Sequence, residues 1–131
     1  MIVVDAGIVI DAGILIALWN RDDAHHELAR GVFEARDSAL MHPVNLGEAL
    51  VYAVAQQQET RARAQLELLG IRAAKPAPDE AFLLARARVA TRLRMPDCCA
   101  LVTAEHLGLP LATTDRRLAD AARSRGVVAL C

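Results

Sequence analysis

The chain has 131 residues, of which 54% are hydrophobic, and its formal net charge is −1. This length is enough for one compact domain that buries a core without a disulfide or a metal staple, and too short for two ordinary domains. The near-neutral charge argues against a strongly basic nucleic-acid-binding surface, although a local arginine patch is not excluded.

The three cysteines and the apolar start of the chain bear on its environment. Cys98, Cys99 and Cys131 are odd in number and two are adjacent, so we expect small buried residues in a reducing compartment rather than a disulfide framework. Asp5 and Asp11 interrupt the apolar start, and each would cost roughly 2.5–3.5 kcal/mol at the centre of a bilayer. No positive region or cleavage pattern accompanies them. We therefore expect no signal peptide, no membrane span and a cytoplasmic protein.

Hydrophobic periodicity and turn residues predict strands that alternate with helices. In chain order the expected elements are strand Ile2–Ile10, helix Gly13–Trp19, helix Ala24–Arg36 with Asp23 as its N-cap, strand Ala39–His42, helix Val44–Gln57, helix Thr60–Leu69, strand Ile71–Ala74, a helix from Pro78 to about Leu93, helix Asp97–Leu107, strand Leu109–Thr114, helix Asp115–Arg125 and strand Val127–Leu130. This alternation predicts an α/β fold with a mainly parallel sheet of four or five strands and helices on both faces. Ligands bind such sheets at the carboxyl ends of the strands.

The phrase Asp-Ala-Gly-Ile occurs twice, at Asp5 and at Asp11, and the two carboxylates compete for the end of the first strand. If Asp5 ended the strand, the next helix would run through Gly7 and Gly13. Each glycine would cost about 1 kcal/mol relative to alanine in a helix, and the β-branched run between them also disfavours a helix. We therefore predict Asp11 at the strand end and Asp5 at a strand start or edge.

Three further acids are candidates for the same edge of the sheet. Asp115 directly follows a buried strand, Asp97 starts a helix after Met-Pro, and Glu48 stands among apolar residues of a helix. Each also has an ordinary explanation, since Asp is a common helix N-cap and Glu48 could lie on an exposed helix face. Four clustered carboxylates are unfavourable unless a cation neutralises them, and Mg²⁺ or Mn²⁺ suits oxygen ligands better than Zn²⁺ does.

The order of Asp11, Glu48, Asp97 and Thr113-Thr114-Asp115 resembles the PIN-domain ribonucleases, and within them the VapC-like toxins of bacterial toxin–antitoxin pairs. The likeness covers essentially the whole chain, residues 1–131, as a single PIN-like domain. Three stretches carry it: Ile10–His26, Val44–Leu50 and Met95–Asp115.

The resemblance implies a three-layer α/β/α sandwich and a Mg²⁺- or Mn²⁺-dependent endoribonuclease that hydrolyses RNA. It also implies a homodimer and a small antitoxin that inserts a segment into the acidic cleft. Carried over, the metal-binding and catalytic acids are Asp11, Glu48, Asp97 and Asp115. Thr113 or Thr114 would supply a supporting hydroxyl. Arg116 and Arg117 follow Asp115 directly and are candidates for contact with RNA phosphate.

One position departs from the family pattern. The family usually has Ser, Thr or Asn two residues after its first Asp, whereas this chain has Gly13. Loss of a hydrogen bond that supports a metal ligand can lower metal affinity or activity by 10–100-fold. A catalytically weak or inactive PIN-fold module that binds RNA or a partner is therefore the alternative. A phosphoryl-transfer receiver domain is disfavoured, because the single lysine, Lys75, is badly placed for it.

Other polar and aromatic residues have structural explanations. We expect His25 and His26 to pack on a helix surface rather than donate a proton, and Trp19 to lie in the core or at a dimer surface rather than stack on a base. Four arginines surround the helix after Pro78 (Arg86, Arg88, Arg92 and Arg94), and its apolar face is expected at Phe82, Ala85, Val89 and Leu93. The arginines are expected to be solvated, with RNA phosphate or an antitoxin carboxylate as the other option.

Overall fold

The computed structural model describes residues 7–131; the first part of the first predicted strand, with Asp5, lies outside the described residues. The elements follow in the order β1 (Val9–Ile10), α1 (Ala12–Trp19), α2 (His26–Glu34), β2 (Ala39–Met41), α3 (Pro43–Ala55), α4 (Glu59–Leu69), β3 (Ile71–Ala73), α5 (Glu80–Thr91), α6 (Met95–Leu107), β4 (Leu111–Ala112), α7 (Arg116–Ser124) and β5 (Ala129–Leu130).

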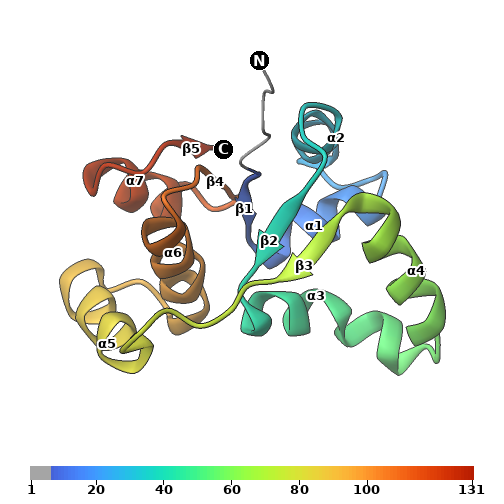
Figure 1. Ribbon diagram of the computed structural model, residues 1–131. Helices are drawn as coiled ribbons and strands as arrows, with labels where there is room; N and C mark the ends of the chain where they lie inside the picture. The colour runs from blue at the N-terminus through green and yellow to red at the C-terminus, as the bar shows by residue number, and fades with distance from the viewer. Residues whose placement is uncertain (1–6) are drawn as a thin grey trace, which may run out of the picture.

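Within the described residues, one sheet has the strand order β3-β2-β1-β4-β5, and every neighbouring pair is parallel (Figure 1). Val9 of the central strand is in register with Leu40 on one side and with Leu111 on the other. The predicted α/β sandwich around a parallel sheet is confirmed.

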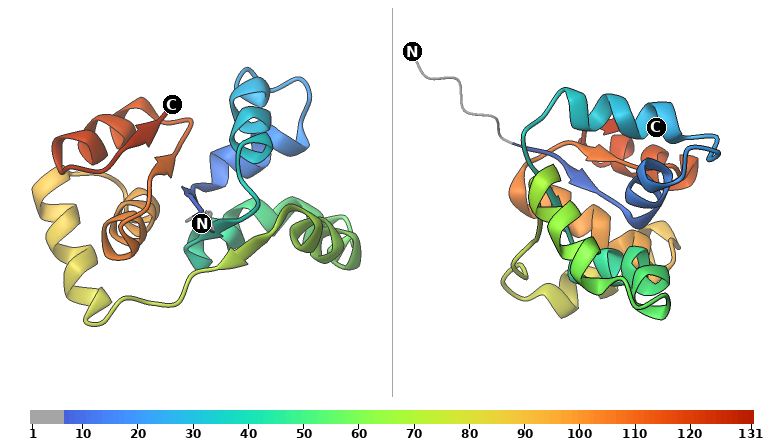
Figure 2. Two further views of the ribbon diagram at one scale, coloured as in Figure 1. Left: turned by 45° about the horizontal axis from the view of Figure 1, so that its top comes forward. Right: turned by 90° about the vertical axis from the view of Figure 1, so that its right-hand side faces the viewer.

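Successive side chains of a strand point to opposite faces, and here they divide the core into two clusters. Val9 and Leu111 pack against the α5–α7 side, whereas Ile8, Ile10 and Ala112 pack against α1 and α2 with part of α3 and α4. Figure 2 shows these groups of helices, yellow to red and blue to green, on opposite sides of the sheet. The order β1-β4 brings the chain's first and fourth strands together, and with them the residues that follow both strands.

Several predicted boundaries are wrong by a few residues, and one shift concerns a candidate acid. Helix α6 begins at Met95 with Arg94 as its N-cap, so Asp97 is the third residue of the helix and not its cap. Proline is well tolerated in the first turn of a helix, which explains why Pro96 does not delay the start. Helix α2 begins only at His26, because Asp23 Oδ1 accepts from the backbone N–H of His25 and caps the preceding turn instead.

The predicted apolar face of α5 is wrong at Phe82 and Val89, although Leu93 is buried as expected. Phe82 is 62% exposed and Val89 is 82% exposed, while Ala87 is buried and Leu83 and Leu84 pack against the core. The apolar residues of this helix surround it almost completely, so periodicity alone does not select the buried side.

The cysteines divide into two groups. Cys98 and Cys99 are buried in α6, as predicted, but Cys131 is exposed. Burial raises the pKa of the Cys99 thiol to about 11. Among residues 7–131, no helix is both long and apolar enough to cross a bilayer.

Candidate functional site

Asp11 lies at the carboxyl end of the central strand β1 and is only 7% exposed. It is the N-cap of α1, and its Oδ1 accepts a hydrogen bond from the backbone N–H of Ile14 at 3.1 Å. Its second oxygen, Oδ2, accepts from the hydroxyl of Thr113. Both carboxylate oxygens are therefore held in place by neighbours that favour the charged form.

Thr113 joins two of the predicted acids. It follows β4, is fully buried, and accepts a hydrogen bond from the backbone N–H of Asp115 at 2.9 Å while donating to Asp11. Asp115 in turn is the N-cap of α7, where its Oδ1 accepts from the backbone N–H of Arg117 at 2.8 Å. The neighbouring strands β1 and β4 thus bring Asp11, Thr113 and Asp115 into one connected group.

Asp97 and Glu48 approach from helices and are held less firmly. Asp97 is 9% exposed in the first turn of α6, and its Oδ2 lies 3.6 Å from Nε of the exposed Arg94. Glu48 is an exposed residue of α3. Helices α3 and α6 contact each other, and the charge of Glu48 acts on Asp97, so these two acids are neighbours.

The electrostatics show that the acids share one neighbourhood. Burial is the main reason that the pKa of Asp11 is raised, and the charges of Asp97 and Asp115 raise it further. Burial likewise raises the pKa of Asp97, with Asp115 and Glu48 adding to the effect and Arg94 opposing it. The structure therefore brings Asp11, Asp97 and Asp115 within electrostatic reach of one another, and Glu48 within reach of Asp97.

Asn45 is a polar residue of this region that sequence reasoning missed. It is buried on α3, one turn before Glu48, and its Nδ2 donates to the carbonyl of Pro96 at 3.0 Å. This bond links the helix of Glu48 to the first turn of the helix of Asp97. Among the described side chains, Asn45 Oδ1 is a buried polar atom without a hydrogen-bond partner. The presence of an Asn inside an apolar helical stretch could have identified this residue from the sequence.

A second missed pair lies beside it. His42 is the N-cap of α3, and its Nε2 lies 3.3 Å from Oε2 of Glu80 at the start of α5. The pair ties the residue after β2 to the segment after β3. Because His42 caps α3, with its Nδ1 accepting from the N–H of Val44 at 3.1 Å, the strand predicted to end at His42 ends at Met41.

The donor set fits a hard divalent cation, since it consists of carboxylate oxygens with no thiolate or imidazole among them. As the side chains of residues 7–131 lie, no three His, Cys, Asp or Glu groups stand together as a metal-binding set. Asp11, Asp97 and Asp115 each direct oxygens at a protein donor, so an ion would have to draw Asp97 away from Arg94 and bring Glu48 closer.

The remaining residues considered in the sequence are two arginines, two histidines and a tryptophan. Arg116 and Arg117 are exposed at the start of α7. His26 lies on α2, where Nδ1 is 2.8 Å from the carbonyl oxygen of Ala17. His25 is the N-cap of the same helix. Trp19 ends α1 and lines a groove beside α3 and α4.

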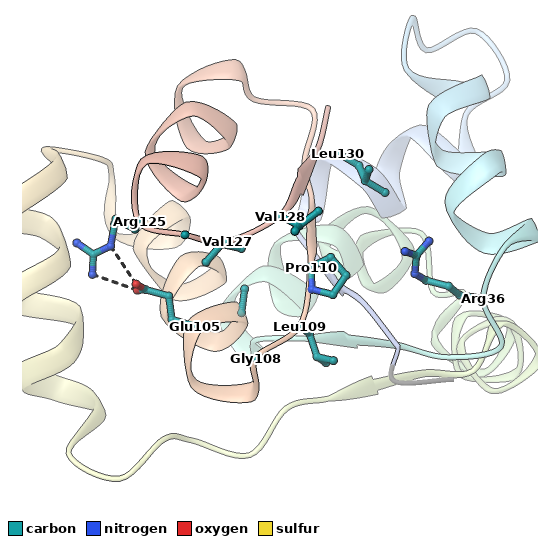
Figure 3. Close-up of a pocket in the computed structure, with 11 residues that line it drawn as sticks. Arg36, Glu105, Gly108, Leu109, Pro110, Arg125, Val127, Val128 and Leu130 are labelled. Atoms are coloured by element: carbon teal, nitrogen blue, oxygen red, sulfur yellow. Dashed lines mark hydrogen bonds and ion pairs between the residues drawn. The ribbon is translucent and has the colours of Figure 1, made fainter. Parts of the chain in front are cut away.

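A cavity of about 440 Å³ lies near the amino ends of β4 and β5 (Figure 3). Asp11 and Asp115 follow the carboxyl ends of β1 and β4, so the cavity is at the opposite edge of the sheet. Leu109, Pro110 and Val128 line it. Arg125 and Glu105 also line it, and they form an ion pair in which Nε of Arg125 lies 3.1 Å from Oε2 of Glu105. None of the four acids lines this cavity. Its residues offer no concentrated set of oxygen ligands, so the candidate chemistry belongs to the carboxyl edge.

Comparison with protein families accounts for this arrangement. The PIN domain model matches residues 8–124, and the chain belongs to that family. The match spans the strand and helix segments that carry all four acids. None of the curated proteins compared with the chain matches it.

Solved structures share the fold over most of the chain. A toxin–antitoxin complex from Klebsiella pneumoniae is 25% identical with a TM-score of 0.70, covering 83% of this chain and 87% of that one. VapC20 of Mycobacterium tuberculosis, a toxin that cleaves the sarcin-ricin loop, is 17% identical with a TM-score of 0.65, covering 93% and 97%. PAE2754 of Pyrobaculum aerophilum is 22% identical with a TM-score of 0.61, and the match covers 94% of this chain and 90% of that one.

Proposed function

We propose that this protein is a Mg²⁺- or Mn²⁺-dependent endoribonuclease and the toxin of a toxin–antitoxin pair. The observation that carries the proposal is the grouping of buried Asp11 and Asp97 with Asp115 at the carboxyl edge of a PIN-family sheet, with Glu48 close to Asp97. The toxin–antitoxin complex of similar fold supports the biological role.

In this proposal Asp11, Asp97, Asp115 and Glu48 hold the cation. When bound, the cation would lower the pKa of a coordinated water so that it can attack a phosphodiester. The hydroxyl of Thr113 keeps Asp11 oriented, because it donates to one carboxylate oxygen and is itself fixed by the N–H of Asp115. Arg116 and Arg117, exposed beside Asp115, would contact the RNA backbone.

Exposed apolar surface supports the proposed partners. Helix α3 exposes Val51, Tyr52 and Val54, and a groove of about 320 Å³ runs from Trp19 along this helix to α4. Exposed apolar patches of this kind mark interaction sites. We assign this groove to the antitoxin, which would also insert a segment into the acidic cleft, and the exposed Phe82 and Val89 of α5 to a homodimer contact.

The central test is cleavage of mixed RNA by the purified protein with Mn²⁺, with Mg²⁺ and with chelator. We expect cleavage with either ion and none with chelator. Asp97→Asn should abolish cleavage, while Asp120→Asn, which removes an exposed acid of α7 paired with Arg123 at 3.7 Å, should leave it unchanged. Equal cleavage by wild type and Asp97→Asn would assign the activity to a contaminant and contradict the proposal.

A catalytically inactive PIN-fold binding module is the second candidate. Two observations favour it: the acids of the described chain do not form a ready three-ligand set, and Gly13 carries no hydroxyl. This protein would bind RNA or an antitoxin with the same affinity in Mn²⁺ and in chelator and would cut nothing. Binding measured in parallel with cleavage distinguishes the two functions.

A further inference from the structure

Gly13 lies in the first turn of α1, two residues after Asp11, and its backbone does not require glycine. Its φ lies outside the left-handed region, unlike that of Gly7, Gly70, Gly108 and Gly126. Glycine is also less favourable than alanine inside a helix. The reason for glycine at this position must therefore be space rather than backbone conformation.

The space beside Gly13 is taken by Thr114. A Cβ on residue 13 would lie 2.2 Å from Oγ1 of Thr114, closer than any non-bonded contact allows, and 3.4 Å from its Cβ. The same Cβ would lie 3.4 Å from Oδ1 of Asp11. The hydroxyl of Thr114 thus stands where a side chain of residue 13 would begin, next to the first acid of the site.

The backbone on either side of Thr114 is fixed. The N–H of Thr113 donates to the carbonyl of Leu130 at 3.0 Å, and the N–H of Asp115 donates to the hydroxyl of Thr113 at 2.9 Å. A β-branched side chain also has few rotamers. Thr114 can therefore yield to a larger residue 13 only by rotating its hydroxyl away from the space that it fills.

The hydroxyl of Thr114 has no hydrogen-bond partner within residues 7–131, in contrast to that of Thr113, which makes two hydrogen bonds. A half-buried donor beside Asp11 is suited to a water or carboxylate oxygen of a metal site. Groups that orient metal ligands in this way affect metal affinity almost as strongly as the ligands do.

We propose that Thr114 is a positioning residue that supplies, from the turn after β4, the hydroxyl missing at Gly13, and that the two residues form a complementary pair. The inference rests on the proposed metal site. Gly13 then does not weaken the site, because the hydroxyl reaches the same space from the neighbouring strand.

The test combines four variants with two measurements, Mn²⁺ affinity by calorimetry and Tm in chelator. Thr114→Ala should keep its Tm but bind Mn²⁺ about 10-fold more weakly. Thr114→Ser, which keeps the hydroxyl, should bind it as wild type does. Gly13→Ser alone should lower Tm, because its Cβ meets Thr114. The double variant Gly13→Ser with Thr114→Ala should recover both Tm and Mn²⁺ affinity.

The outcomes separate this inference from the proposed function. If wild type binds Mn²⁺ and Thr114→Ala binds it equally well, the role of Thr114 is wrong while the metal site stands. If Gly13→Ser has the Tm of wild type, the two residues are not a complementary pair. If wild type binds no Mn²⁺, the proposed function fails, and the role of Thr114 at a metal site fails with it.

Discussion

The candidate site has a rigid half and an adaptable half. The strand-end half, Asp11 with Thr113 and Asp115, is joined by hydrogen bonds that run from β1 to β4 and on to α7. The helix half, Asp97 and Glu48, has one long contact to exposed Arg94 and an exposed carboxylate. The two halves differ because parallel neighbouring strands fix relative positions through backbone ladders, whereas helix positions depend on side-chain packing.

This difference indicates how a cation would be bound. The strand-end half is already oriented by the protein, so little rearrangement would be needed there. The helix half would supply the adjustment, with Asp97 leaving Arg94 and Glu48 moving inward. Adjustment of this kind is consistent with the lack of a ready three-ligand set among the described residues.

The largest effect is expected from removing the oriented acid. Substitution of a residue that hydrogen-bonds to a metal ligand typically lowers metal affinity by 10–100-fold. Asp11→Asn alters a proposed ligand itself and should lower Mn²⁺ affinity by more than that. Glu48→Gln, at the exposed end of the helix half, should lower it by about 10-fold. Calorimetric titration measures both. Equal losses in the two variants would show that the division into rigid and adaptable halves is wrong.

The buried hydroxyl of Thr113 gives the next largest effect. Thr113→Val keeps the shape but leaves a carboxylate oxygen of Asp11 and the N–H of Asp115 without a partner, so the free energy of unfolding should fall by about 1–3 kcal/mol. Thr113→Ser keeps the hydroxyl, so its free energy of unfolding should fall by less than that of Thr113→Val. Chemical denaturation measures the difference. A Thr113→Val protein as stable as Thr113→Ser would contradict the bridging role.

The link between α3 and α6 should have a smaller effect. Asn45→Ala removes the hydrogen bond to Pro96 and should lower the free energy of unfolding by about 0.5–1.5 kcal/mol. It should also weaken Mn²⁺ binding, because Glu48 and Asp97 lose their common support. Val51→Ala on the exposed side of α3 is the matched control and should change stability by less than about 0.5 kcal/mol. A loss of stability without any change in Mn²⁺ affinity would limit Asn45 to a structural role.

The smallest effect concerns pH. Because burial raises the pKa of Asp97 above its ordinary value of 3.8, the folded state holds a proton that the unfolded state has already released. Stability of the metal-free protein should therefore fall as pH rises from 3.8 through the raised pKa, and Asp97→Asn should remove that part of the fall.

The measurement is the difference in Tm between Asp97→Asn and wild type in chelator. This difference should be larger at pH 7 than at pH 4, and saturating Mn²⁺ should reverse its sign by stabilising only wild type. A difference independent of pH would mean that Asp97 carries no net burial penalty.

Much of this arrangement was accessible from sequence because it depends on local rules. The cost of glycine and β-branched residues in a helix selected Asp11 over Asp5, and the structure indeed places Asp11 after β1 and at the start of α1. Gly70 marked the end of α4 at Leu69 correctly, whereas β4 ends at Ala112, two residues before the predicted end at Thr114. Placing acids at the carboxyl ends of parallel strands then predicted their proximity.

Other features depend on contacts between distant segments. The outward direction of Phe82 and Val89 depends on which side of α5 meets the core, and that helix is apolar nearly all round. The bond from Asn45 to Pro96 joins residues 51 positions apart. The start of α6 at Met95 made Asp97 a residue of the first turn that faces Arg94 rather than a cap.

The sequence by itself determined the α/β alternation and the parallel sheet and singled out the candidate acids, because strand ends, caps and glycine costs act within a few residues. Only the tertiary structure decided that Thr113 bridges Asp11 to Asp115 and that Thr114 fills the space at Gly13. Both contacts join residues directly after β1 to the turn after β4, about a hundred residues apart in the chain. They depend on the strand order that sets those two strand ends side by side.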